Sequence, residues 1–283
     1  MSRPEIRHQN KLSVAVSIEP QAFFVRKIAA YPNVENAYHV DIETLVPPGR
    51  EPETYAPSPE KIRKLAQCRV FFSIGFPAEQ NLLPRLKSQA PHLRVVDVLE
   101  GLKLHEDHHH HAGHAAHAHG GADPHIWMSP ALVKEQAGVI RDTLIGIDPA
   151  GKEDYIANCE KFLVELTDLQ KKVHEKLDPL AGKTIYVYHP SYAYFCEEFG
   201  LVQRAIEVEG KSPSPREIAD WIKTFKADHV RAVIIQPEFN QSAARMIAEQ
   251  TAAELIEHSP LESEYYISVL RLADSISRMY GQK

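Results

Sequence analysis

The stretch KEDYIANCEKFLVELTDLQKKVHEKL, residues 152–177, decides the fold that we expect for this chain. From Tyr155 to Leu177 its apolar residues recur at spacings of three and four, which is the pattern of one long amphipathic helix. At a rise of roughly 1.5 Å per residue, a helix of this length would span about 39 Å, the width of a small domain. Pro179 and Gly182 follow and end the helix. A single long helix in the middle of the chain therefore predicts two lobes that it joins.

Short strands and helices alternate on both sides of this helix. The predicted strands cover residues 12–18, 38–46, 70–74, 93–98, 183–188, 202–206, 230–235 and 255–257. The predicted helices cover residues 21–30, 60–67, 82–89, 130–145, 191–199, 242–251 and 264–280. Such alternation favours mainly parallel sheets that are covered by helices on both faces.

A repeated motif supports two similar lobes. Pro57-Ser58-Pro59 and Pro213-Ser214-Pro215 each lead through a helix into a buried strand. We therefore predict an α/β fold with an N-terminal lobe over 11–147, a linking helix over 149–178 and a C-terminal lobe over 182–283. Ligands of open α/β sheets bind beyond the carboxyl ends of the strands, so a cleft between the lobes is the expected site.

Composition excludes several classes of protein. The 283 residues are 43% hydrophobic and 25% charged, with a net charge of −6, which indicates a globular chain without the basic surface of a nucleic-acid-binding protein. No apolar run approaches the roughly 20 residues that a membrane helix needs. The first ten residues are polar and show no signal peptide, which indicates either a cytosolic protein or a processed form. The cysteines, Cys68, Cys159 and Cys196, are too scattered for a disulfide framework and are expected to be buried.

Histidine is unusually abundant, with 16 residues in the chain. Half of them lie in a tract of His, Ala and Gly over residues 104–121, where we expect a mobile loop with weak, multiple metal sites. They are His105, His108, His109, His110, His111, His114, His117 and His119. The tract formally contains an HExxH sequence, but its glycine and polar density argue against the helix that this motif needs.

Three side chains outside the tract are candidate metal ligands. Glu53 lies in the loop after the second predicted strand, His125 lies just before a helix start at Ser129-Pro130, and His189 directly follows the strand over 183–188. All three therefore lie in loops or just beyond strand ends, where a bound ion is expected.

The segments around these residues resemble the metal-binding solute receptors of bacterial ABC importers, the zinc/manganese cluster, and the His tract resembles its zinc branch. The resemblance runs from about Leu12 to the end of the chain and is carried by Leu45-Val46-Pro47-Pro48-Gly49 with Glu51-Pro52-Glu53-Thr54-Tyr55, Asp123-Pro124-His125-Ile126-Trp127 with Ser129-Pro130, His189-Pro190-Ser191-Tyr192-Ala193-Tyr194-Phe195 with Phe199-Gly200-Leu201, Gly210 to Ile218, and Ile235-Gln236-Pro237-Glu238-Phe239.

The resemblance implies a periplasmic receptor, not an enzyme, that captures a divalent metal between two lobes and delivers it to an ABC-type permease. It implies a monomer, and a lipid anchor before Met1 would fit it. The chain departs from the family at two positions. Glu53 stands where the family usually has histidine, and Ser259 stands where it often has aspartate before Pro-Leu.

The resulting ligand set is Glu53, His125 and His189, completed by water or by an imidazole of the tract. Two imidazoles and a carboxylate suit Zn²⁺, whereas Mn²⁺ or iron would favour more oxygen ligands. Nickel, copper or cobalt are further alternatives. Glu238 and His258 lie near the same strand ends and are secondary candidates.

Three other functions stay open at this point. A zinc hydrolase uses a similar ligand set but needs a general base beside the metal, for which Glu238 is the candidate. A metal-storage protein would use only the His tract. An adhesin-like surface role would be a secondary activity.

Overall fold

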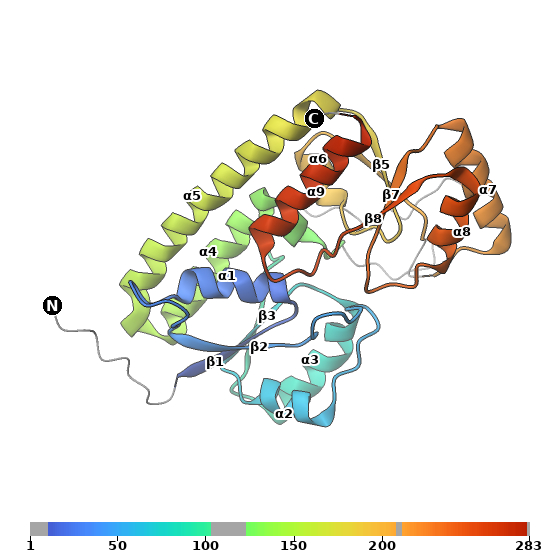
Figure 1. Cartoon of the computed structure of the whole chain (residues 1–283). Coiled ribbons are helices and arrows are strands. Elements are labelled where there is room, and N and C mark those ends of the chain that lie inside the picture. The colour runs from blue at the N-terminus through green and yellow to red at the C-terminus, as the bar shows by residue number, and fades with distance from the viewer. Residues whose placement is uncertain (1–10, 103–122, 208–210, 282–283) are drawn as a thin grey trace. The chain divides into compact units, whose positions relative to one another are not determined.

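The structure is a computed structural model that describes residues 11–102, 123–207 and 211–281 (Figure 1). These residues form two compact units. The first unit contains the described residues as far as Pro47, together with Pro52–Glu100 and Gln136–Phe162. The second contains Pro48–Glu51 and the described residues of Gly101–Glu135 and from Leu163 onwards. The predicted lobe bounds follow chain order, whereas contacts group the residues around His125 with the second unit, so those bounds stay a prediction.

The first unit is built on a four-stranded parallel sheet with the order β2-β1-β3-β4. Its strands are β1 (Leu12–Val16), β2 (Val40–Thr44), β3 (Val70–Ser73) and β4 (Arg94–Asp97). All four lie within the ranges predicted from the sequence, and β3 is buried along its whole length. A strand that is buried on both faces reads as a continuous apolar run, which is why Val70 to Ile74 was recognisable.

The helices of the first unit follow its strands. They are α1 (Glu19–Ala29), α2 (Pro59–Ala66) and α3 (Pro77–Gln89). The prediction of a helix over residues 82–89 was wrong at its N-terminal end by more than one turn, although its C-terminal end at Gln89 was correct. The helix begins instead at Pro77, where proline fits the first turn because the missing N–H has no helical partner there.

The second unit repeats this topology with a parallel sheet of order β6-β5-β7-β8. Its strands are β5 (Thr184–Val187), β6 (Val202–Ala205), β7 (Ala232–Ile235) and β8 (Glu254–Glu257). Its helices include α6 (Ala193–Glu198), α7 (Pro215–Ala227), α8 (Ser242–Thr251) and α9 (Tyr265–Met279). The order matches that of the first sheet strand for strand, which accords with the duplication indicated by the two Pro-Ser-Pro motifs.

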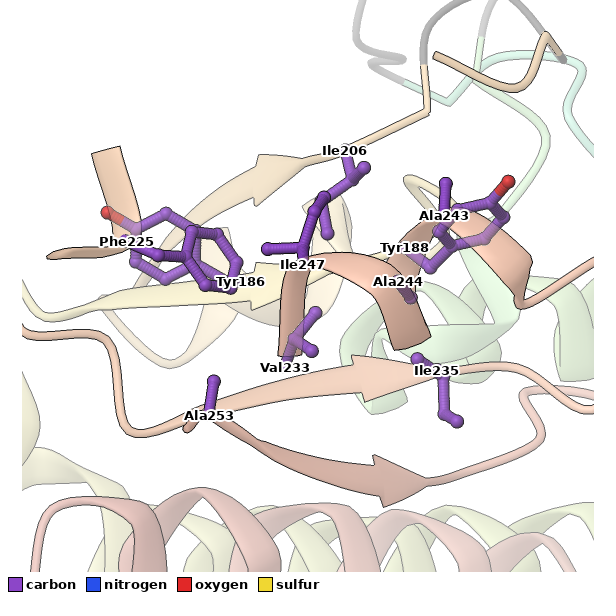
Figure 2. Close-up of a cluster of buried hydrophobic side chains, with 10 residues drawn as sticks. All are labelled: Tyr186, Tyr188, Ile206, Phe225, Val233, Ile235, Ala243, Ala244, Ile247 and Ala253. Carbon is purple, nitrogen blue, oxygen red and sulfur yellow. The ribbon is translucent and has the colours of Figure 1, made fainter. Parts of the chain in front are cut away.

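One face of the second sheet packs against α7 and α8. Figure 2 shows this core, in which Tyr186 of β5 and Val233 of β7 meet Phe225 of α7 and Ile247 of α8. The ring centroids of Tyr186 and Phe225 are 5.0 Å apart in an edge-to-face arrangement, which is favourable for aromatic pairs. This packing fixes the strands whose carboxyl ends carry the candidate site.

Two long helices connect the sheets in sequence. They are α4 (Pro130–Ile147) and α5 (Lys152–Leu177), and α5 has the bounds predicted from its apolar spacing. By its contacts, α5 belongs to the first unit as far as Phe162 and to the second from Leu163. Among the described residues, no helix combines the length and the apolar character that crossing a membrane requires. The three cysteines are buried, as expected.

Candidate metal centre

His189 lies two residues beyond the end of β5 and is 2% exposed. Its main chain is held by Gln236, the first residue after the neighbouring strand β7. The Gln236 amide donates to the His189 carbonyl over 2.8 Å, and the His189 N–H donates to the Gln236 Oε1 over 3.1 Å. Because one buried side chain satisfies both main-chain groups, the position of His189 is fixed relative to the sheet.

The ring of His189 is oriented by two further side chains. Its Nδ1 lies 3.0 Å from the Oε2 of Glu207, a buried residue just beyond β6. The Phe239 ring stacks on the imidazole with centroids 4.0 Å apart and an interplanar angle of 18°. An ionised carboxylate can only accept a hydrogen bond, so Nδ1 carries the proton and Nε2 is the nitrogen suited to a metal.

His125 is oriented in the same way by Asp123. One carboxylate oxygen of Asp123 accepts from the His125 main-chain N–H over 2.9 Å and lies 2.7 Å from the ring Nδ1. Both residues are buried. The ring of His125 therefore also offers Nε2, and its conformation is set by a local turn that closes around Pro124.

The segment carrying His125 is tied to the helix that follows His189. The Tyr194 hydroxyl of α6 donates to the Asp123 carbonyl over 2.9 Å. At the other end of the segment, the Glu198 carboxylate of α6 accepts from the Ser129 hydroxyl. These bonds link the two imidazole-bearing segments within the second unit.

The two imidazoles face each other closely enough to share one ion. Their centroids are 5.3 Å apart with an interplanar angle of 67°, and one ring nitrogen from each lies within 4.8 Å of the other. Two nitrogens bound tetrahedrally to one zinc at about 2.0–2.1 Å would be roughly 3.3 Å apart. The upper limit of 4.8 Å on the separation of the two nitrogens is compatible with such a shared ion.

The third predicted ligand, Glu53, lies in the first unit, between β2 and α2, and is half-buried. It directly follows Pro52 in the loop whose preceding residues, Pro48–Glu51, belong to the second unit. The structure therefore describes two of the three predicted ligands as a pair inside one unit. The eight tract histidines lie outside the described residues.

The two secondary candidates differ in their surroundings. The Glu238 carboxylate accepts from the Ser259 hydroxyl, and burial raises the Glu238 pKa. Its Oε2 is buried and has no hydrogen-bond partner within the described part of the chain. His258 lies with Nδ1 3.1 Å from the Tyr192 hydroxyl and Nε2 3.1 Å from the Ser268 carbonyl. Because both of its ring nitrogens are engaged, the geometry favours a structural role for His258.

Sequence reasoning missed the residues that orient the imidazoles. Asp123 could have been found from its spacing, because an aspartate two residues before another residue often accepts from its main-chain N–H. Glu207 directly follows a predicted strand, as His189 does, but only the pairing of β5 with β6 brings the two together. Gln236 depends in the same way on the pairing of β5 with β7.

Comparison with known proteins places this chain in a family. The family model described as "Zinc-uptake complex component A periplasmic" (ZnuA) matches residues 14–278. The chain is 27% identical to the high-affinity zinc uptake system protein ZnuA of Yersinia pestis, over 95% of this chain and 89% of that protein. It is 28% identical to the manganese-binding lipoprotein MntA of Halalkalibacterium halodurans, over 75% of this chain and 68% of that protein.

Solved structures agree with this assignment. A crystal structure of ZnuA is similar with a TM-score of 0.85 and 32% identity, over 95% of this chain and 99% of the other. A ZnuA deletion mutant with zinc bound is similar with a TM-score of 0.85 and 31% identity, over 97% of this chain and all of the other. The chain belongs to the ZnuA family of periplasmic zinc-uptake components.

Proposed function

We propose that this protein is a zinc-binding solute receptor that captures Zn²⁺ outside the cytoplasm and delivers it to an ABC-type membrane permease. The observation that carries the proposal is the pair of buried imidazoles, His125 and His189, each with its Nδ1 beside a buried carboxylate. Neutral imidazole is a good ligand for zinc, and most of the relatives described above are named for zinc.

Glu53 is proposed as the third ligand. It offers a carboxylate oxygen to the candidate ligand set with the two histidines. The chemistry of the side chain supports this role, because a carboxylate oxygen is a common zinc ligand, at about 2.0–2.2 Å. One carboxylate also offsets half of the charge of a divalent ion. Water or a tract imidazole would complete four ligands, and Glu238 is the secondary protein candidate.

Zinc is favoured over manganese by the donor atoms. Manganese relatives exist, as the similarity to MntA indicates, but Mn²⁺ favours oxygen ligands. The set proposed here has two nitrogens and one carboxylate. We therefore expect Zn²⁺ to bind more tightly than Mn²⁺, with Mn²⁺ as the alternative cargo.

We also propose that the protein is a receptor and not an enzyme. It acts as a monomer and does not bind nucleic acid. Relatives named as uptake-system proteins and as lipoproteins support transport outside the cytoplasm, with a lipid anchor as one way of holding the receptor there. The net charge of −6 gives no electrostatic attraction for nucleic acid.

The test is a zinc titration against a competing chromogenic chelator, with metal content measured on the purified protein. We expect one tight site per chain, and a loss of affinity on the order of 100-fold or more for His125→Ala and for His189→Ala, because each removes one ligand of a buried ion. His92→Ala changes an exposed histidine and should leave the affinity unchanged.

Three results would count against the proposal. Wild-type protein without a tight zinc site would refute it outright. Binding that survives both histidine changes and disappears on deletion of residues 107–119 would make the tract the main site. Peptide or ester hydrolysis by the zinc-loaded protein, abolished by His125→Ala, would support the hydrolase instead.

A further inference from the structure

We infer that Asp123 and Glu207 are positioning residues that hold both imidazoles in the same tautomer, so that the second unit by itself presents two Nε2 atoms to the metal. The inference rests on the proposed function, since it assumes that zinc binds to His125 and His189. The inference goes beyond the proposed function by naming the ligand atoms and the residues that select them.

Glu207 is placed for this role by the sheet. Its main-chain N–H donates to the Tyr188 carbonyl over 2.9 Å, which continues the pairing of β6 with β5 by one more bond. The carboxylate is thereby held beside the residue that follows Tyr188, and its Oε2 lies 3.0 Å from the His189 Nδ1. Glu207 is only 5% exposed, so water cannot easily replace this partner.

Asp123 is placed by its own turn. A single oxygen, Oδ1, serves both the main-chain N–H and the ring Nδ1 of His125, so the ring cannot turn over without breaking the bond to Nδ1. The Asp123 main chain is anchored in turn by the Tyr194 hydroxyl. The backbone of the turn and the orientation of the imidazole are therefore coupled through one carboxylate.

The two carboxylates should also strengthen zinc binding. A carboxylate that accepts from Nδ1 makes the imidazole a better electron donor at Nε2, and loss of such a partner commonly weakens metal binding about 10- to 100-fold. Their negative charges, one ring away from the ion, add to that of Glu53 in offsetting the charge of Zn²⁺. Both effects need only contacts that lie within the second unit.

The first experiment reads the ligand atoms directly. Long-range ¹⁵N–¹H NMR spectra of the zinc-loaded wild-type protein, with the ring signals assigned by His125→Ala and His189→Ala, distinguish a protonated Nδ1 from a metal-bound one. We expect Nδ1 to be protonated and Nε2 to be bound to zinc in both rings. Zinc on Nδ1 of either ring would overturn the inference while leaving the proposed function intact.

The second experiment measures zinc affinity in graded variants. Glu207→Ala and Asp123→Ala should each weaken zinc binding about 10- to 100-fold, because the ring loses its acceptor. Glu207→Gln and Asp123→Asn keep an acceptor oxygen but lose the charge, so they should restore part of the affinity. Their NMR spectra should keep the Nδ1-protonated form more fully than those of the alanine variants.

Matched controls remove the same charges elsewhere. Asp168→Asn on α5 and Glu249→Gln on α8 change exposed residues and should leave zinc affinity unchanged. Variants of Asp123 and Glu207 that bind zinc as tightly as these controls would refute the inference. If an alanine variant fails to fold, the amide variants and the wild-type spectra still decide the question. If the wild-type protein has no tight zinc site, the proposed function fails first.

Discussion

The two sheets have the same strand order, yet different side chains follow the central strands β1 and β5. After β1 in the first unit, the Ser17 hydroxyl donates to the buried carboxylate of Glu79. After β5 in the second unit, the His189 imidazole meets the buried carboxylate of Glu207. Each unit therefore places a buried carboxylate beside the carboxyl end of a central strand, and among the described residues its partner there is a hydroxyl in the first unit and an imidazole in the second.

The partners of the two carboxylates explain the difference. Glu79 accepts from the main-chain N–H groups of Ile74 and Gly75 over 3.1 and 2.9 Å, so it closes the turn between β3 and α3. Its hydrogen bonds are made to the protein's own backbone and to one hydroxyl. Glu207 instead faces a ring whose second nitrogen is suited to a metal. A buried carboxylate at a strand end therefore does not by itself indicate a metal site; the group that it hydrogen-bonds must also be known.

Among single substitutions in the second unit, Trp127→Ala should cost the most stability. Trp127 is 1% exposed, its Nε1–H donates to the Pro260 carbonyl over 2.8 Å, and its ring centroid lies 5.1 Å from that of His125. Truncation should lower the free energy of unfolding by about 3–5 kcal/mol. It should also weaken zinc binding, because the His125 segment loses an anchor.

Phe24→Ala is the matched change in the first unit, where Phe24 is fully buried against Phe162. We expect a similar loss of stability in urea unfolding but a smaller loss of zinc affinity. Equal losses of affinity in the two variants would mean that zinc binding reports general stability and not the anchoring of His125.

Sequence patterns predicted the elements well where a local signal exists. The bounds of α5 followed from apolar spacing alone, because a long amphipathic helix repeats its signal over many turns. The start of α3 did not, because Pro77 and Glu79 form a helix start that depends on the preceding turn, and α3 also contains Pro84. One proline inside a helix is tolerated when the rest of the chain compensates for the lost bond.

The residues of the candidate site also differ in whether the sequence predicted them. His125 and His189 were recognisable from the sequence because each stands at a predicted element boundary. Glu207 and Gln236 were not, because they reach His189 across sequence separations of 18 and 47 residues through strand pairing. Such contacts depend on the order β6-β5-β7, which the sequence does not state.

The buried carboxylate of Glu79 in the first unit should make the free energy of unfolding depend on pH. Burial raises the pKa of Glu79 to about 7, partly offset by its hydrogen bonds to Ser17 and the backbone, so the folded state binds this proton more tightly than the unfolded state does. Its contribution to stability is present below the unfolded-state pKa of 4.5 and is lost as the pH rises through about 7. The change should amount to roughly 3 kcal/mol.

Glu79→Gln removes this titration, so the difference in unfolding free energy between wild type and variant should shift by about that amount between pH 4.5 and pH 8. Glu249→Gln, which changes an exposed residue, is the control and should give a constant difference. A constant difference for Glu79→Gln as well would show that this carboxylate has an ordinary pKa in the folded protein.

A smaller effect should separate the third buried histidine of the second unit from the other two. Among the described residues, the ring nitrogens of His258 contact no carboxylate: Nδ1 lies 3.1 Å from the Tyr192 hydroxyl and Nε2 3.1 Å from the Ser268 carbonyl. Burial lowers the pKa of His258 to about 4. His258→Phe should cost about 1–3 kcal/mol, because its polar partners lose their bonds. Zinc affinity, measured by chelator competition, should stay at the wild-type value. A loss comparable to that of His189→Ala would identify His258 as a ligand.

The smallest expected effects test whether the two repeated helix starts are equivalent. Ser58 accepts from the Lys61 N–H over 3.2 Å, whereas Ser214 forms a reciprocal capping box in which the Glu217 carboxylate also accepts from the Ser214 N–H over 2.7 Å. Either serine-to-alanine change should cost about 1 kcal/mol in urea unfolding. Ser214→Ala should cost more, because Glu217 loses one of its two partners as well.

The pH dependence should separate the two changes further. Hydrogen bonds from Ser214 lower the pKa of Glu217, so this part of the cap is present above the ordinary carboxyl pKa and is lost as the pH falls through the lowered value. The excess cost of Ser214→Ala over Ser58→Ala should therefore shrink in acid, while zinc affinity at neutral pH stays unchanged in both variants. An excess that persists at low pH would mean that the serine hydroxyl alone, and not the reciprocal carboxylate, distinguishes the second helix start from the first.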